Sequence, residues 1–492
     1  MGGAEPRRAA TNGGHVDAAS TPRRAASRRA DPGHRLGYAV NLKPMRGDVR
    51  SQMAIDDVKF GSHSEGRGTP DGVLFARVRD GLMEPERVLA LVLLVAFVTR
   101  AIWLALPTGA LIFDEAFYVN AARVILGWDL APGAHYAGAV AGLDPNTEHP
   151  PLGKLLMAAS MAVFGDNGLG WRLPSLVAGM IALGALYKII RATGESAWLG
   201  VLAVGLFAMD NLSLVHGRIG TLDMMVLAAI LLSAWAAVGG RWLAAGALAG
   251  LGLLVKLTAL YGLLALLLMI AIALLGVWRS EHRLHRGDFR PLASAIGGVL
   301  LVAGAGLWIL DARFSSFTNP IDHVGHMFEY GAGLTRPGGP PTDCLSNDSA
   351  PWQWLANDCE MRYLRVATDT SVDGKVIATH ASIDFRGAMN PVLLGAMSLA
   401  VPFAIWSALR RRNRLAIWAL IWIGANYLPY VALALVSNRI TYIYYFLPVV
   451  PALSAIIALL ILRSGLPRAV QLGYVVVYLV GFGAYFPFRQ IP

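Results

Sequence analysis

Within residues 88–119, VLALVLLVAFVTRAIWLALPTGALIFDEAFYV, a long apolar run is followed at once by two adjacent carboxylates, Asp114 and Glu115. The apolar part, 88–107, carries a single charge, Arg100, and as a helix it is long enough to cross the roughly 30 Å hydrocarbon core of a bilayer. The chain as a whole is 55% hydrophobic and only 15% charged, with a mean hydropathy of +0.51. This composition is too apolar for a soluble globular protein of 492 residues and predicts an all-α integral membrane protein.

Windows of about 20 residues predict about eleven transmembrane helices. Eight apolar runs are long, at 88–107, 172–190, 219–238, 291–311, 389–409, 415–436, 440–462 and 469–487. A shorter run at 196–212 and a helical hairpin over 241–278, broken near Lys256, complete the set.

Lysine and arginine are retained in short loops on the cytoplasmic side, so their distribution predicts the orientation. They gather in alternate turns, at Lys188 and Arg191, Arg241, Arg279 to Arg290, Arg410 to Arg414, and Arg463 and Arg468. This threading puts an Arg-rich, disordered tail, 1–86, in the cytosol; a later start at Met45, Met53 or Met83 is the alternative. The membrane domain is then 87–492, with outer loops at 108–171 and 312–388.

Both outer loops are expected to be ordered. Residues 114–126 have the amphipathic pattern of a helix lying on the membrane surface, and 151–164 form an apolar run too short to span, as in a re-entrant helix. In the second loop, paired tryptophans in SAPWQWLANDC favour an anchored structure at the membrane interface. Cys344 and Cys359 lie in the same loop, where a disulfide persists if the loop is outside; two free thiols remain the alternative.

Charged residues cluster on the predicted outer side. Each charge near membrane depth costs roughly 2.5–3.5 kcal/mol on insertion scales, so each needs a partner or a function. The set comprises Arg100, Asp114, Glu115, Glu148, His149, Lys154, Arg172, Asp210, Arg218, Asp223, Lys256 and Arg439. Ion pairs at helix ends explain any one of them, but the one-sided grouping indicates a polar cavity open to the outside.

Several cations suit a phosphate, and a carboxylate beside them suits a general base. A phosphate at the membrane edge implies a lipid phosphate, and Arg439 in SNRITYIYYFLP is well placed to bind it. The aromatic residues at 442–446 then line a sugar or prenyl site, or form an interface belt. From charge alone, we assign His149 and Lys154 a supporting role around acceptor or phosphate.

Seven segments carry a resemblance to a known family. In chain order they are TRAIWLALPTGALIFDEAFYV, HPPLGKLL, WRLPS, DNLSLVHGRIGTLDMMV, KLTALYGLL, SAPWQW and NRITYIYYFLPVVPAL. Over roughly residues 95–450 the chain resembles the protein O-mannosyltransferases, which are membrane glycosyltransferases of the GT-C class that use polyprenyl-phosphate sugars. The resemblance is to the bacterial type. The chain departs from the family pattern at Thr147-Glu148 before His-Pro-Pro and at His216-Gly217 before Arg218.

The resemblance implies transfer of mannose from polyprenyl-phosphate mannose to Ser or Thr hydroxyls of exported proteins, at the outer face of the cell membrane. Asp114 is then the general base and Glu115 its neighbour in the family's DE motif. Arg100 and Arg172 match arginines that the family needs for activity, and Arg439 matches the cation that binds the donor phosphate. We assign no dedicated metal site, and the sequence does not decide whether a divalent cation, Mg²⁺ or Mn²⁺, joins a carboxylate to the phosphate.

Other functions are distinguishable. A related lipid-linked transferase that moves another sugar onto a lipid or polysaccharide shares the fold and the carboxylate, so only its product separates it. A transporter or flippase predicts charges at the bilayer midplane and an inverted repeat, which the sequence does not display. A structural scaffold leaves the charge cluster unexplained. The net charge of +10 is explained by topology and the tail, and no nucleic-acid partner is expected.

Overall fold

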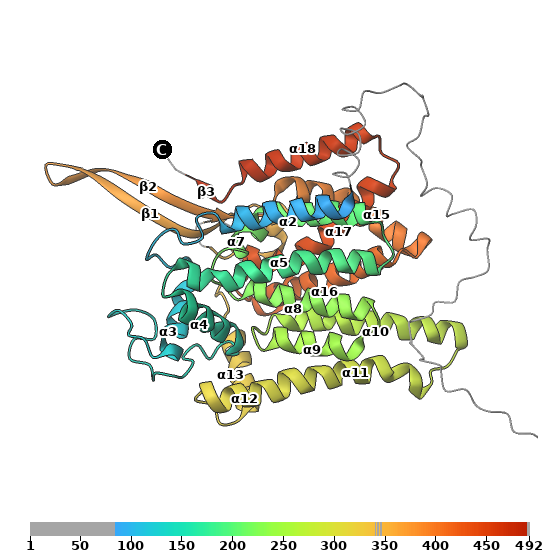
Figure 1. Ribbon diagram of the computed structural model, residues 1–492, viewed down its shortest axis with the longest axis horizontal. Helices are drawn as coiled ribbons and strands as arrows, with labels where there is room; N and C mark the ends of the chain where they lie inside the picture. The colour runs from blue at the N-terminus through green and yellow to red at the C-terminus, as the bar shows by residue number, and fades with distance from the viewer. Residues whose placement is uncertain (1–83, 340, 342–343, 345–346, 490–492) are drawn as a thin grey trace, which may run out of the picture. The chain divides into compact units, whose positions relative to one another are not determined.

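The computed structural model describes residues 84–339, 341, 344 and 347–489, which are mostly helical (Figure 1). The predicted tail, 1–86, lies outside the described residues except for its last three. By length and composition, six helical segments within the described ranges are candidate membrane spans. They are α5 (Gly168–Ala192), α10 (Ala259–Glu281), the segment Arg286–Phe314, α15 (Pro391–Arg411), α16 (Arg414–Ser437) and the segment Ile443–Arg463.

Two of these spans are composite. The first joins η2 (Arg286–Phe289), α11 (Arg290–Val299), η3 (Leu300–Gly304) and α12 (Ala305–Phe314), and the other joins η4 (Ile443–Val449) to α17 (Val450–Arg463). Shorter helices occupy the five remaining predicted spans: α2 (Pro85–Ala101), α6 (Ala197–Ala208), α8 (Asp223–Val238), α9 (Trp242–Leu253) and α18 (Arg468–Ala484). Every predicted span thus contains a helix, while the number that cross a membrane, about eleven, stays a prediction.

The core lies around α8 and α17, which are buried on almost every side. Helix α8 packs against α5 and α9, and α17 packs against α6 and α15. A helix that is apolar all round, such as these two, is stable only when it is surrounded by other helices. Side chains start the neighbouring helices by accepting backbone N–H groups, since Ser196 caps α6, Asn390 caps α15 and Asn413 caps α16.

Short helices gather at one end of the long ones (Figure 1). They include α3 (Glu115–Leu126), α4 (Leu152–Phe164), α7 (Asn211–His216) and α13 (Pro320–Gly333), and α14 (Pro351–Trp354) follows in the second loop. Helices α3 and α4 match the amphipathic and short apolar segments that the sequence predicts. Cys344 and Cys359 form a disulfide, as expected, with Cα atoms 5.2 Å apart.

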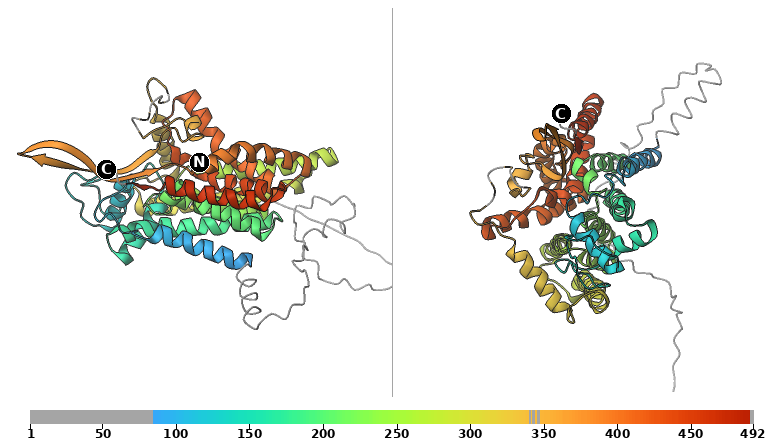
Figure 2. Two further views of the ribbon diagram at one scale, coloured as in Figure 1. Left: turned by 90° about the horizontal axis from the view of Figure 1, so that it is seen from above. Right: turned by 90° about the vertical axis from the view of Figure 1, so that its left-hand side faces the viewer.

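A β-hairpin corrects the all-α prediction. Strands β1 (Met361–Val372) and β2 (Lys375–Gly387) pair in an antiparallel manner, and β3 (Phe488–Arg489) joins the β2 side. Asp373 and Gly374 connect the strands with φ values of 50° and 74°, the positive values that a two-residue type I′ turn needs. Figures 1 and 2 show the hairpin extending beyond the end of the helices at which α3 and α4 lie.

Candidate functional site

Glu115 is fully buried and its carboxylate is completely used inside the protein. Its two oxygens accept backbone N–H groups from Ile112 and Gly220, both at 2.7 Å. The same oxygens accept Nε and Nη2 of Arg172 at 2.7 and 2.9 Å. Four donors on one carboxylate fix the first turn of α3 to the segment that follows α7.

Arg172 is the other half of this anchor. Besides Glu115, its guanidinium donates to the backbone carbonyls of Leu104 and Leu106 at 2.8 Å and of Ala110 at 3.2 Å. Since an arginine carries five N–H groups, all of its donors are occupied. The bonds hold the stretch between α2 and α3, and the geometry gives Arg172 a positioning role for the loop that ends at Asp114.

Asp114 differs from its neighbour. It sits at the N-cap of α3, and among the described residues its carboxylate accepts one hydrogen bond, from the hydroxyl of Tyr118 at 3.5 Å. Burial raises the pKa of Asp114 to about 7; the nearby Lys256 opposes that rise, and Asp223 adds to it. A partly accessible carboxylate with such a pKa is suited to accept a proton near neutral pH.

Two further charged residues lie beside Asp114. Lys256, at the break between α9 and α10, forms an ion pair with Asp223, with Nζ 2.9 Å from Oδ1. The second oxygen of Asp223, Oδ2, is buried without a hydrogen-bond partner in the described part of the chain. Lys256 also lies over the ring of Tyr444, 5.6 Å from its centroid. The sequence analysis counted Asp223 and Lys256 among the outer-side charges but did not pair them or assign either to the site.

The hairpin reaches this cluster through Tyr363. The tyrosine hydroxyl lies 2.8 Å from Nε2 of His216, and its ring meets Phe113, the residue before Asp114, edge-on at 5.4 Å. Tyr363 has no opposite residue on β2, because the register shifts there, and such a bulge re-aims a side chain. At Gly387 an added Cβ would collide with this ring, so the glycine makes room for it.

Arg439 lies close to several tyrosines. Its charge acts on the hydroxyls of Tyr261, Tyr330 and Tyr445, and its guanidinium lies next to Gly331 of α13. Within the part of the chain that the structure describes, no hydrogen bond or ion pair occupies this guanidinium. It is half-buried and uncommitted, as a binding group for an anion should be.

Lys154 is committed elsewhere. Its ammonium pairs with Asp144 at 2.6 Å and donates to the backbone carbonyls of Asn146 and His149. These bonds fold the segment before α4, where His-Pro-Pro lies.

Burial lowers the pKa of His149 well below its usual range, and Lys256 and Lys154 add to this effect. His149 is therefore neutral near pH 7, with its ring 5.9 Å from that of Tyr118.

Helix α13 is fastened to the same segment by a buried histidine. Nδ1 of His323 lies 2.8 Å from Oδ1 of Asp311, and Nε2 lies 3.0 Å from the carbonyl oxygen of Thr147. Phe317 stacks on this imidazole, with ring centroids 4.6 Å apart. The contact ties α12, α13 and the His-Pro-Pro segment together.

Arg100 is also buried and used. It donates to the carbonyls of Ala96 and Ala208 and to the hydroxyl of Ser213. The structure therefore brings Asp114 together with Asp223 and Lys256, and places Arg439 near Tyr445, on which the charge of Lys256 also acts. Arg100, Glu115, Lys154 and Arg172 fasten the surrounding segments. In the described ranges no three His, Cys, Asp or Glu side chains converge as a metal-binding group.

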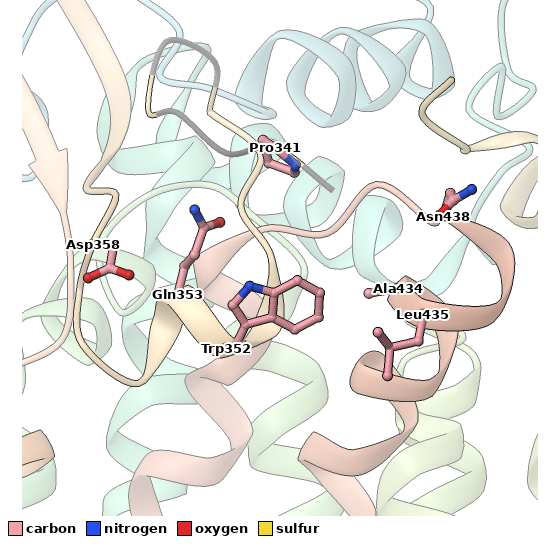
Figure 3. A pocket seen from close by; sticks show the side chains of 7 residues that line it. All are labelled: Pro341, Trp352, Gln353, Asp358, Ala434, Leu435 and Asn438. Carbon is pink, nitrogen blue, oxygen red and sulfur yellow. The ribbon is translucent and has the colours of Figure 1, made fainter. Parts of the chain in front are cut away.

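One cleft lies apart from this cluster. It has a volume of about 540 Å³ and is lined by Pro341, Trp352, Gln353, Asp358, Ala434, Leu435 and Asn438 (Figure 3). None of the acids and bases above lines it. A much smaller hollow lies among Asp223, Tyr444 and Tyr445. We place the candidate site at the smaller hollow, because Asp223 lines it and Lys256, the ion-pair partner of Asp223, lies over Tyr444 beside it.

Comparisons with known proteins agree with this architecture. A sequence model described as dolichyl-phosphate-mannose-protein mannosyltransferase matches residues 148–303. A polyprenol-phosphate-mannose–protein mannosyltransferase of Corynebacterium glutamicum is 26% identical, over 75% of this chain and 81% of the relative. The chain is a glycosyltransferase related to the protein O-mannosyltransferases. The match to a Mycobacterium tuberculosis protein of the same name is 36% identical but covers only 28% of this glycosyltransferase and 25% of that relative.

A solved structure shares the fold. The S. cerevisiae protein O-mannosyltransferase Pmt1-Pmt2 complex bound to the sugar donor superposes with a TM-score of 0.59 at 11% identity. The superposition covers 82% of this glycosyltransferase and 90% of the yeast chain. The chain therefore shares the helical fold of the yeast complex. The family match, 148–303, includes Lys154 and Lys256 but neither Asp114 nor Arg439, so the roles of the latter two rest on geometry.

Proposed function

We propose that this glycosyltransferase moves mannose from polyprenyl-phosphate mannose to Ser or Thr hydroxyls of exported proteins. The observation that carries the proposal is that the structure provides two different charged groups, a carboxylate suited to accept a proton and a guanidinium suited to bind a phosphate. Asp114 is a carboxylate with a pKa raised to about 7, and Arg439 is an uncommitted guanidinium close to several tyrosines. The names of the relatives supply the sugar, the lipid carrier and the protein acceptor.

The proposed reaction is a direct displacement. Asp114 removes the proton from the acceptor hydroxyl as that oxygen forms a bond to the anomeric carbon of mannose. The bond from this carbon to the phosphate oxygen breaks, and the electron pair leaves with the polyprenyl phosphate. Arg439 stabilises the charge that develops on the phosphate, and Lys256 adds positive charge near the reacting atoms.

In this mechanism Glu115 and Arg172 act indirectly. Their shared bonds fix the loop before α3, and so they hold Asp114 at one place and orientation. A base must lie within hydrogen-bond reach of the proton that it takes, and a displacement of about 1 Å is costly. The pair thus has a positioning role in the proposed reaction.

We place the reaction at the outer face of the cell membrane. The basic turns of the sequence favour this orientation. The disulfide between Cys344 and Cys359 supports it, because disulfides persist in oxidising compartments. The segments that contact Asp114 would then face the acceptor as it leaves the cell.

The test is transfer of radiolabelled mannose from polyprenyl-phosphate mannose to a Ser/Thr-rich peptide, in membranes that contain the wild-type chain or Asp114→Asn. Label on the peptide with the wild type alone is the expected result. Label on a lipid or polysaccharide would instead identify a related transferase with another acceptor. Transfer of a different sugar, with no mannose transfer, would refute the assigned donor.

A further inference from the structure

The β-hairpin joins an open strand edge to the candidate site. Strand β1 is the outer strand of the sheet, whose order is β1-β2-β3, so its other edge carries no strand within the described ranges. At the base of this edge, the bulged Tyr363 turns into the cluster around Asp114. A segment that lies along β1 and runs toward Tyr363 would therefore be led to Asp114, the proton acceptor of the proposed reaction.

A side chain of the protein already imitates a neighbouring strand at that base. The Asn347 carboxamide donates to the carbonyl of Arg362 at 3.0 Å and accepts its N–H at 3.1 Å. These two bonds are those that the N–H and C=O of one residue in an adjacent antiparallel strand would make. On the opposite side of the sheet, a backbone carbonyl makes one such bond, since the N–H of Arg386 donates to the carbonyl of Pro487. The edge at Arg362 thus has the geometry of a strand-pairing position.

We propose that β1 binds the acceptor polypeptide as an added β-strand and delivers its hydroxyl residue to Asp114. This inference rests on the proposed function, because it names how the acceptor of that reaction is recognised. Strand addition uses main-chain hydrogen bonds and leaves the side chains of the bound segment free. It suits an enzyme that modifies many different proteins, provided that the modified segment is extended.

An acceptor fits this edge better than a second copy of the chain does. The edge begins beside the catalytic carboxylate, where a polypeptide substrate must arrive, and it extends beyond the end of the helices that holds α3 and α4 (Figures 1 and 2). Pairing of two hairpins would bring two copies together without using that position. Exposed charges at Arg365 and Asp369 also disfavour uncontrolled edge-to-edge association.

The test uses the wild-type enzyme and backbone-methylated peptides that contain one Thr. In an added strand only alternate N–H groups face the neighbour. One peptide carries N-methyl groups two and four residues before the Thr, and its matched control carries them one and three residues before it. We expect kcat/KM to fall about tenfold for one of the two peptides and to change less than about twofold for the other.

A shortened hairpin gives the second measurement. Removal of 367–372 and 375–382 lets Asp373-Gly374 join Val366 to Ile383, which already pair. Tyr363 and Gly387 remain, so the donor KM should be unchanged while kcat/KM for the peptide falls about tenfold and the difference between the methylated peptides disappears.

Each outcome is decisive. No transfer to the unmethylated peptide by the wild type would refute the proposed function itself. If kcat/KM is the same for the two methylated peptides, whether both are unchanged or both are lowered, strand addition alone is overturned. A change of oligomeric state in the shortened variant, without an alternating effect of methylation, would identify the edge as a contact between copies and also overturn the inference.

Discussion

Glu115→Gln and Asp114→Asn should fail in different ways, although the two acids are adjacent. Glu115 accepts four donors, two from Arg172 and one each from Ile112 and Gly220. A glutamine offers one oxygen and one amide group, so two of these buried donors lose their acceptor and Arg172 loses its counter-charge. Breaking a buried ion pair from one side costs about 3–5 kcal/mol, and we expect that loss in the free energy of unfolding.

Asp114→Asn should leave stability nearly unchanged. Within the described ranges its carboxylate accepts a single hydrogen bond, from Tyr118, and an amide oxygen accepts that bond equally well. The expected change in the free energy of unfolding is within about 1 kcal/mol. Activity should nevertheless fall about 10²- to 10⁴-fold, the usual contribution of a general base.

The assay follows tryptophan fluorescence during heating in nanodiscs, and measures single-turnover transfer at a temperature where both variants remain folded. Arg172→Lys is the matched control, because a lysine keeps the charge but cannot reach Glu115 and three carbonyls at once. It should behave like Glu115→Gln. If Glu115→Gln melts at the wild-type temperature but loses as much activity as Asp114→Asn, the positioning role is refuted. Glu115 would then take part in the chemistry.

Three other predictions concern the anion-binding group, the pH dependence and the disulfide. Arg439→Ala should raise the donor KM about tenfold or more without lowering the melting temperature, as steady-state kinetics with varied donor would measure; an unchanged donor KM contradicts its phosphate role. Because the pKa of Asp114 is raised to about 7, the base form is lost as the pH falls, so kcat/KM should decline about tenfold per unit below that value. Lys256→Met removes the cation that lowers this pKa, and a pH profile should show the decline beginning at higher pH; a profile that does not move argues against their coupling. Replacing Cys344 and Cys359 by Ser should lower the free energy of unfolding by about 2–4 kcal/mol in thermal denaturation, and equal stability would show that the loop is held by other contacts.

The helices were predictable because a membrane-spanning helix requires a long run of apolar residues, which is visible in the sequence. Long apolar runs allow no other backbone structure in lipid, and each predicted run contains a helix. The hairpin was missed because its strands mix polar and apolar residues. They lie in a segment, 312–388, that was assigned as a loop only because it lies between two apolar runs. Asp373-Gly374, flanked by Val372 and Lys375, was the available local signal.

The candidate site was predictable in its parts but not in its pairings. The Asp114-Glu115 pair and Arg439 stand out as charges in an apolar chain. The difference between the two acids depends on the fold. The carboxylate oxygens of Glu115 accept hydrogen bonds from Arg172 and two backbone groups, whereas those of Asp114 do not. Lys256 meets Asp223 across 33 positions of sequence, and such contacts cannot be deduced without the packing of α8 against the neighbouring helices.

The contacts of His323 fix a proton count. A carbonyl oxygen only accepts, so Nε2, facing Thr147, must carry hydrogen; another hydrogen must lie between Nδ1 and Oδ1 of Asp311. Whether that second proton belongs to the imidazole or to the acid, the two residues together have no net charge. Electrically, the contact that fastens α13 is therefore a dipole, which costs less to bury than a single ion.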